Sequence, residues 1–294
     1  MIKVLRFLAI CTIGAAFATS SIAWAQTYTQ VDYPGAVTTS LNGGPNLEGT
    51  SVGSWFDGTD FHGFSLTAKG KFTSFDPPGS VATSPNFINL EGVIVGSYFD
   101  GTATHGFILS GGKYTIVNAP SAAGTILSGI NLFGEMSGAT CSDAACDASA
   151  TLESFVVSNK GVYEFFNPHG ATSSSASTVS DLGAVVGAYT NTVGELNHGY
   201  LLFGGKYTTI DFPGATTGTF AGGGNLQNDI IGVYNQNTFP GGEAFLLSNG
   251  VYTSFSYPAS GVEFTEATGI NLFDVIVGLF FDSAGNEHGF IRTP

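Results

Sequence analysis

The sequence predicts an all-β fold, a six-bladed β-propeller of four-stranded antiparallel blades. Three observations predict it: six copies of a repeat, four short strand-like runs in each copy, and chain ends that fall part-way through the repeat. Four strands in about 45 residues is the size of one propeller blade. Residues 26–294 are therefore expected to form a single propeller domain.

The repeat is visible as columns of like residues at spacings of 42 to 49. A glycine column lies in an Ile-Val-Gly-type run, and an aromatic column lies in each of the next two runs. These runs are rich in Val, Ile, Thr, Tyr and Phe and are bounded by Gly, Asn or Pro, which is typical of short strands. The columns are Gly53, Gly96, Gly138, Gly187, Gly232 and Gly278; Phe64, Phe107, Phe155, Tyr200, Phe245 and Phe290; and Tyr28, Phe72, Tyr114, Tyr163, Tyr207 and Tyr252.

The glycine-bearing run is expected to be the innermost strand, because small side chains suit a crowded axis. The His-Gly-Phe run then comes second, the Tyr-Thr run third and the Ser/Thr/Gly-rich run outermost. The exported chain starts two strands into the repeat, at Tyr28, and ends two strands into it, at Pro294. A ring in which N- and C-terminal strands share one blade leaves no bare strand edge, so closure is expected.

Residues 1–25 have the layout of a secretory signal peptide. Lys3 and Arg6 precede an apolar run over 7–17, and Ala23-Trp24-Ala25 offers a small-residue cleavage site. The apolar run is too short to span a membrane. The sequence therefore predicts export to the periplasm, cell surface or medium, with no membrane insertion.

Cleavage at that site leaves a strongly acidic protein. Six basic residues stand against 22 acidic ones, a net charge near −16. So few cations do not neutralise a phosphate backbone or an anionic lipid surface, which argues against nucleic-acid and membrane partners. Proteins, glycans and cations remain as partner classes. The basic residues are Lys69, Lys71, Lys113, Lys160, Lys206 and Arg292.

Cys141 and Cys146 are the only cysteines outside the signal peptide. A close, isolated pair in an exported protein favours a disulfide over a metal site or two free thiols. The pair lies between Gly138 and Phe155, the longest departure from the repeat. Insertions on a rigid scaffold are where function tends to concentrate.

Four of the five histidines occupy one repeat position, which raises the possibility of a metal ring. Hairpin register instead predicts a cross-strand polar pair in every copy, because turn length fixes which residues face each other. Opposite charges or amides are the partners that such pairs favour. The expected structural pairs are His62 with Asp76, His105 with Asn118, Glu153 with Asn167, His198 with Asp211, Glu243 with Ser256, and His288 with Asp32.

The triplets His62-Gly-Phe64, His105-Gly-Phe107, His198-Gly-Tyr200 and His288-Gly-Phe290 resemble the HAF extracellular repeat of bacterial exported proteins. The resemblance covers essentially the whole exported chain, and the copies at Glu153 and Glu243 depart from it. It implies an extracellular repeat protein and implies no particular chemistry.

Three further groups of residues are weighed as sites. One is a column of asparagines that form turns or line the mouth of a channel that binds a neutral sugar. Its members are Asn46, Asn89, Asn131, Asn225 and Asn271, with Ser180 in the sixth copy. Asp57, Asp100 and Asp282 read as turn residues or as calcium ligands, although no calcium-loop motif is present. Glu48 and Glu91 are a conceivable acid/base pair.

No catalytic residue, cofactor or metal site is assigned from these patterns. The leading interpretation is a non-catalytic binding or scaffold module that presents loops to a protein or glycan. The alternatives are a hydrolase or lyase acting on extracellular carbohydrate and a purely structural surface protein. Convergent carboxylates in an axial pocket favour the enzyme, an Asn-lined or aromatic mouth favours binding, and a plugged axis favours the structural role.

Overall fold

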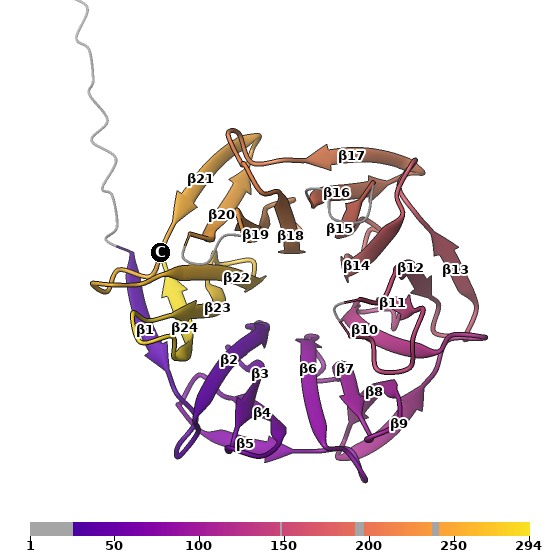
Figure 1. Ribbon diagram of the computed structural model, residues 1–294, viewed down its shortest axis with the longest axis horizontal. Coiled ribbons are helices and arrows are strands. Elements are labelled where there is room, and N and C mark those ends of the chain that lie inside the picture. The colour runs from indigo at the N-terminus through magenta and orange to yellow at the C-terminus, as the bar shows by residue number, and fades with distance from the viewer. Residues whose placement is uncertain (1–25, 148, 192–196, 237–240) are drawn as a thin grey trace, which may run out of the picture.

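The computed structural model describes residues 26–147, 149–191, 197–236 and 241–294, so the predicted signal peptide lies outside the described residues. All regular structure in this part of the chain is β-strand, arranged around a central axis as a β-propeller (Figure 1). Within the same residues, no helix is long and apolar enough to cross a membrane.

The described strands form four sheets of four strands and one of eight. The four-stranded sheets are β10 (Gly124–Ile130), β11 (Met136–Cys141), β12 (Leu152–Val157) and β13 (Tyr163–Phe166); β14 (Ser173–Val179), β15 (Val185–Thr190), β16 (His198–Phe203) and β17 (Lys206–Ile210); β18 (Thr219–Gly224), β19 (Ile230–Tyr234), β20 (Glu243–Ser248) and β21 (Val251–Phe255); and β22 (Phe264–Ile270), β23 (Ile276–Phe281), β24 (Glu287–Thr293) and β1 (Thr27–Val31).

The eight-stranded sheet consists of two antiparallel meanders. The first is β2 (Thr38–Gly43), β3 (Ser51–Phe56), β4 (Phe61–Leu66) and β5 (Phe72–Phe75); the second is β6 (Ala82–Ile88), β7 (Ile94–Phe99), β8 (Thr104–Ser110) and β9 (Lys113–Val117). One parallel bridge, between Phe61 and Ala82, joins them. Each meander has the same strand order as the four-stranded sheets.

The two ends of the chain share one sheet. Strand β1 pairs antiparallel with β24 from Thr27 opposite Thr293 to Val31 opposite Gly289. The rings of Tyr28 and Phe290 lie 6.3 Å apart. The expected division of two strands from each end is wrong, because the N-terminus contributes only β1 and the C-terminus contributes three strands.

The predicted strand order within a blade is also wrong. The Ser/Thr/Gly-rich strands β2, β6, β10, β14, β18 and β22 are the innermost, and the Tyr-Thr strands lie outermost (Figure 1). The glycine column has a different role: each glycine pairs across the strands with the buried aromatic residue of the next strand, as Gly96 does with Phe107. A Cβ on Gly96 would lie 2.9 Å from Cε1 of that ring.

Each inner strand carries a β-bulge, and four of the bulged side chains, those of Asn42, Asn86, Ser177 and Thr268, bond to the neighbouring meander or sheet. Asn86 Nδ2 donates to Leu127 O at 2.8 Å, and Thr268 Oγ1 donates to Leu41 O at 2.7 Å, across the join between the two chain ends. Bulges re-aim side chains, and here they produce contacts between sheets. The bulged positions are Asn42, Asn86, Ser128, Ser177, Gly222 and Thr268.

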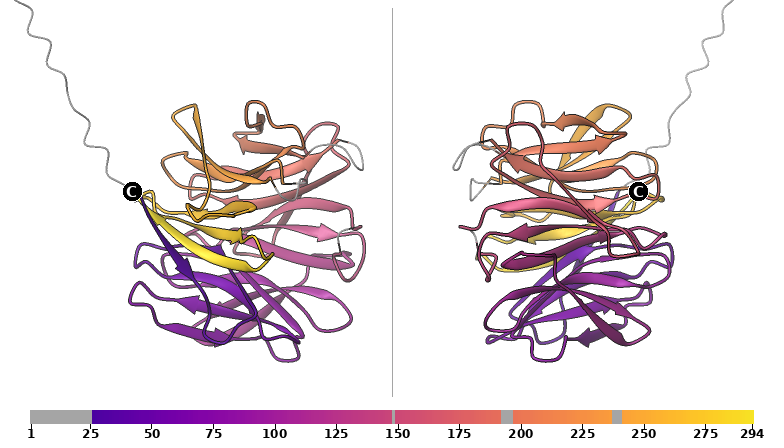
Figure 2. Two further views of the ribbon diagram at one scale, coloured as in Figure 1. Left: turned by 60° about the vertical axis from the view of Figure 1, so that its left-hand side comes forward. Right: turned by 90° about the vertical axis from the view of Figure 1, so that its right-hand side faces the viewer.

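The hydrophobic core is divided among the interfaces between neighbouring sheets, which Figure 2 shows packed side by side around the ring. One aromatic side chain from the third strand of each four-stranded sheet and of each meander is fully buried: Phe64, Phe107, Phe155, Tyr200, Phe245 and Phe290. Burying one such ring contributes roughly 2–3 kcal/mol. Because apolar residues are buried between neighbouring sheets, removing one sheet would expose the cores on both of its sides.

Replacing Gly96 by Ala is expected to lower the free energy of unfolding by about 1–3 kcal/mol, the usual cost of overpacking. The added methyl group would lie 2.7 Å from Pro85 Cα and 2.9 Å from the Phe107 ring. Urea denaturation measures the change. Thr115→Ala, on the exposed outer strand β9, is the matched control; equal stability of the two variants would contradict the packing role of the glycine column.

Candidate functional site

The propeller has two distinct ends along its axis. At the turn end, short turns containing the asparagine column connect the first and second strands of each sheet. At the loop end lie the connections between second and third strands, among them 57–60, 100–103, 142–151 and 282–286. The histidines begin the third strands and so lie at the loop end.

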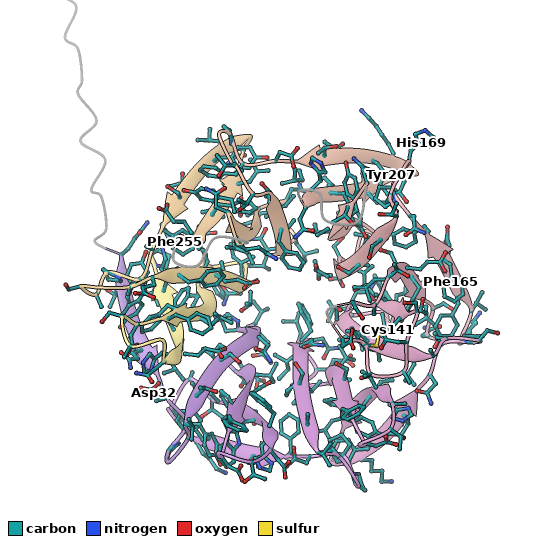
Figure 3. All side chains as sticks on the ribbon, viewed as in Figure 1. Asp32, Cys141, Phe165, His169, Tyr207 and Phe255 are labelled. Atoms are coloured by element: carbon teal, nitrogen blue, oxygen red, sulfur yellow. A yellow bond between two sulfur atoms is a disulfide. The ribbon has the colours of Figure 1, made fainter. Side chains whose placement is uncertain are left out.

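The structure places each of the four repeat histidines beside its expected partner. The Nδ1 atom of His62 lies 2.8 Å from Asp76, and that of His288 lies 2.7 Å from Asp32. The corresponding distances are 2.9 Å for His105 and Asn118, and 3.0 Å for His198 and Asp211. Figure 3 places Asp32 at the periphery of the ring, away from the axis.

Three of these histidines have a second partner that register reasoning did not reveal. The Nε2 atom of His62 lies 3.4 Å from Asp57, that of His105 3.2 Å from Asp100, and that of His288 3.5 Å from Asp282. The same aspartates accept backbone N–H groups within their own turns. Among the described residues, no group of three or more His, Cys, Asp or Glu is arranged to hold a metal ion.

The two glutamate copies make other contacts. Glu243 Oε2 accepts a hydrogen bond from Tyr234 Oη at 2.6 Å. Glu243 and Ser256 both line a small cavity of about 310 Å³. Asn167 Oδ1 accepts from Ser174 Oγ at 2.6 Å, while Glu153 is exposed and lies opposite Thr140.

The asparagine column encircles the axis at the turn end, and its amide groups bond to backbone. Asn46 Oδ1 accepts from the N–H groups of Glu48 and Thr50, and its Nδ2 donates to Asn89 O of the neighbouring sheet at 3.2 Å. Asn225 repeats this link to Asn271 O. These bonds account for the column without a ligand, and sugar binding by it stays a prediction.

The turn end also carries an apolar ring around a cavity of about 120 Å³. The residue after each turn asparagine is Leu47, Leu90, Leu132, Leu226 or Leu272, and Asp181 takes this place in the copy with Ser180. Glu48 and Glu91 are exposed on the same turns, outside the cavity wall. They do not converge on an enclosed space as an acid/base pair would.

The predicted disulfide between Cys141 and Cys146 is confirmed. It closes the long β11–β12 connection, which is tied to the preceding sheet: the Thr104 N–H donates to Ala144 O and its hydroxyl donates to Ala145 O, both at 2.7 Å. The disulfide thereby holds one edge of this connection against the axial cavity, whose wall includes Ala145 and Cys146.

A cavity of about 740 Å³ occupies the axis toward the loop end. Hydroxyl and amide groups of the inner strands line it, including those of Asn42 and Asn86, together with the half-buried Phe220. Its wall contains the bulged positions and the residues two positions before them, which are Ser40, Ser84, Ile126, Ser175, Phe220 and Glu266. No Lys, Arg or His lines this cavity among the described residues.

Two carboxylates, Glu266 and Glu287, face this cavity from the sheet that contains both chain ends. Burial raises the pKa of Glu266 to about 7, and the nearby charge of Glu287 adds to the rise. Burial also raises the pKa of Glu287, although a hydrogen bond from the Ser40 side chain and the charge of His288 act against it. Like charges in a desolvated site disfavour simultaneous ionisation.

Sequence reasoning missed this pair. Glu266 replaces the small or apolar residues of the other copies, but that column becomes visible only when the bulge position is known. Glu287 precedes His288 in the copy that ends the chain. The available signal was a carboxylate in an inner-strand column that is otherwise uncharged.

Comparison with solved structures supports the fold. The chain is similar to a luciferin-regenerating enzyme, with 14% identity, coverage of 92% of this chain and 95% of that chain, and a TM-score of 0.59. It is similar to virginiamycin B lyase from Staphylococcus aureus, with 12% identity, coverage of 92% of this chain and 99% of that chain, and a TM-score of 0.53. It is also similar to the Aleuria aurantia lectin in complex with α-methyl-L-fucoside, with 11% identity, coverage of 88% of each chain, and a TM-score of 0.52. These neighbours are β-propellers of varied function. No family model and no curated protein matches the chain.

The two-sided contact of His62 is expected to hold its imidazole in the protonated form. Ionised carboxylates only accept hydrogen bonds, so a ring between two of them donates from both nitrogens. Desolvation lowers the pKa of His62, but the hydrogen bonds to Asp76 and Asp57 outweigh it and raise the pKa above 6.5. NMR titration should find the His62 midpoint above 6.5, and Asp76→Asn should lower that midpoint. Glu164→Gln, on the exposed face of β13, should leave the His62 midpoint unchanged.

This contact stabilises the fold below pH 6.5, and its contribution is lost as the pH rises through the folded-state pKa of His62. The side chains are 25% and 32% exposed, so its size should stay below about 1 kcal/mol. A His62 midpoint at or below 6.5 would contradict the two-carboxylate contact.

Proposed function

We propose that this protein is an exported six-bladed β-propeller that binds a hydroxyl-rich ligand of the glycan class in its axial cavity. The observation that carries the proposal is the cavity wall, which combines uncharged hydroxyl and amide groups, aromatic rings and two carboxylates in about 740 Å³. Cavities of this size, with a few convergent polar groups, are typical of small-ligand sites.

The blade count in this proposal divides the eight-stranded sheet in two. One bridge pair joins its halves, whereas five register pairs or more join β2 to β3 and β6 to β7 within each half. Each half also repeats the strand order of a complete four-stranded sheet. Two blades here and four elsewhere agree with six copies of the repeat.

Export is supported by two features of the chain. The signal-peptide pattern over residues 1–25 directs secretion, and the disulfide between Cys141 and Cys146 suits an oxidising compartment. The HAF-like triplets agree with an extracellular location.

The chemistry of the wall favours a sugar over an apolar molecule. The Asn42 amide donates to the hydroxyls of Ser54 and Ser84, so a preformed polar network lines one side. The hydroxyls of Ser128 and Ser175 make no hydrogen bond to another described side chain and are available to a ligand. Hydroxyl groups of a sugar match such donors and acceptors, and the half-buried Phe220 offers a surface for its apolar face.

Filling the cavity is expected to weaken ligand binding. Ser175→Phe places a ring where the wall now has a hydroxyl group, and it should weaken the binding of any glycan found in a screen by about tenfold or more. Isothermal titration calorimetry on residues 26–294 measures the affinity. Thr253→Phe, on the exposed outer strand β21, is the matched control.

Two results would overturn the proposal. One is a screen in which no glycan binds the wild-type protein. The other is a glycan that binds Ser175→Phe as tightly as it binds the wild type, since its site would then lie outside the axial cavity.

A carbohydrate-active hydrolase or lyase is the second candidate, favoured by the carboxylates Glu266 and Glu287 in the same cavity. A carboxylic acid with a raised pKa serves as a proton donor, and a neighbouring carboxylate serves as a base. This pairing provides the groups that cleavage of a glycosidic bond requires.

If the protein is an enzyme, incubation with the bound glycan should release smaller fragments detectable by mass spectrometry. Glu266→Gln removes the proton donor and should reduce the rate by about a hundredfold or more, the usual size of acid/base assistance. Binding without release of fragments by the wild-type protein would leave the lectin-like function and exclude the catalytic one.

A further inference from the structure

The charges around the axial cavity are unbalanced. Glu266 and Glu287 are the only ionisable acids or bases on its wall apart from Tyr98, and no cationic side chain among the described residues reaches it. Buried carboxylates are normally paired with a cation or fully hydrogen-bonded. Glu287 has one hydrogen bond, from Ser40. Glu266 accepts none from any described residue; it is half-buried, and it lines the cavity wall.

The basic residues of the chain lie elsewhere. Lys69, Lys71, Lys113, Lys160 and Lys206 are exposed beside the outer hairpin turns. Arg292 is buried against the Phe255 ring, with its Cζ atom 4.5 Å from the ring centre, and its Nε donates to Gln26. None of these cations is positioned to neutralise the two carboxylates.

The elements packed around Glu266 also lack a cation. It faces Leu279 of β23 across the strand pair, and its neighbours in the same wall are Phe220 of β18 and Ser40 of β2. The nearest histidine, His288, acts on Glu287 and already bonds to Asp32 and Asp282 at the periphery. A positive charge beside these carboxylates would therefore be supplied by a bound ligand and not by a described residue of the chain.

We propose that the axial cavity selects a ligand carrying an ammonium group, which binds to Glu266 and Glu287, together with hydroxyl groups, which bind to the serine and asparagine wall. This combination is the chemistry of an amino sugar. The inference rests on the proposed glycan-binding function and narrows its ligand class.

Each part of such a ligand has a matching part of the cavity. An ammonium group has three N–H donors and no acceptor, so it satisfies carboxylate oxygens that no described residue reaches. Charge-assisted hydrogen bonds of this kind are the strong ones. Away from the carboxylates, the hydroxyls of Ser128 and Ser175 and the amide of Asn86 lie on other strands of the same wall. A ring held between these two regions would be bound at both ends.

The test compares two trisaccharides that differ only in the group at C2, chitosan trisaccharide with an amino group and cellotriose with a hydroxyl. At about pH 7, calorimetry should show that chitosan trisaccharide binds about tenfold tighter or more. Its affinity should fall toward about pH 5, because the glutamates become protonated.

A second measurement needs no variant. In wild-type protein with ¹³C-labelled glutamate, saturation with chitosan trisaccharide should lower the titration midpoint of Glu266 by about one unit or more, because a bound cation favours the ionised form. Cellotriose should leave the Glu266 midpoint in place.

Variants provide a third measurement. Glu266→Gln and Glu287→Gln should each bring the ratio of the two affinities toward one, whereas the exposed Glu164→Gln should preserve that ratio.

The outcomes separate the two proposals. Equal affinity for the two sugars overturns the ammonium site and leaves glycan binding intact. Absence of binding by either sugar, with other glycans also negative, overturns both. If Ca²⁺ alone lowers the Glu266 midpoint and removes the preference for chitosan trisaccharide, the carboxylates form a cation site, and the amino-sugar proposal is wrong.

Discussion

The pairing of β1 with β24 is the interaction on which the rest of the structure depends. It joins residues 27–31 to the last strand of the chain, and without it one sheet loses its outer strand and the Tyr28 ring leaves Phe290. Its counterpart at the axis is the Thr268 hydroxyl, which donates to Leu41 O across the same join. Both contacts connect residues more than 220 positions apart, so the ring closes only after the whole chain has been made.

Closure also determines what kind of residue faces the axis. Inner strands that converge on one axis leave room for short side chains, and the described ones carry serine, threonine, glycine and asparagine at the bulged positions. Some of these side chains are used to bond the next sheet, as Ser177 Oγ is to Ala221 O. The remaining hydroxyls line the cavity. The same constraint that holds the sheets together therefore produces a polar-walled space at the centre of the molecule, with the apolar cores kept between the sheets.

Much of the architecture was predictable because it repeats. Columns of six like residues predicted the strands and the propeller, and hairpin register predicted His62 beside Asp76. Strand order within a blade was not predictable in this way, because a glycine such as Gly96 fits both a crowded axis and the space beneath an aromatic ring. The second histidine partners, such as Asp57, depend on how a loop folds back, which register does not describe. Glu266 was missed for the opposite reason: it occurs once, and column analysis emphasises what recurs.

A residue that occurs once in six copies and costs stability requires a reason. The five other copies place Ser, Ile or Phe where Glu266 stands, and each of these uncharged side chains suits the wall without the desolvation penalty of a charge. Glu266 adds a carboxylate beside Glu287; among the described residues no cation lines the cavity wall, and the hydrogen bond from the Ser40 side chain reaches only Glu287. Scaffold stability alone would favour an uncharged side chain at this position. Binding sites commonly retain groups that destabilise the empty protein because a ligand compensates for them. The cost of this pair in the ligand-free ring is thus the physical argument for proposing a site at the axis and not at the histidines of the periphery.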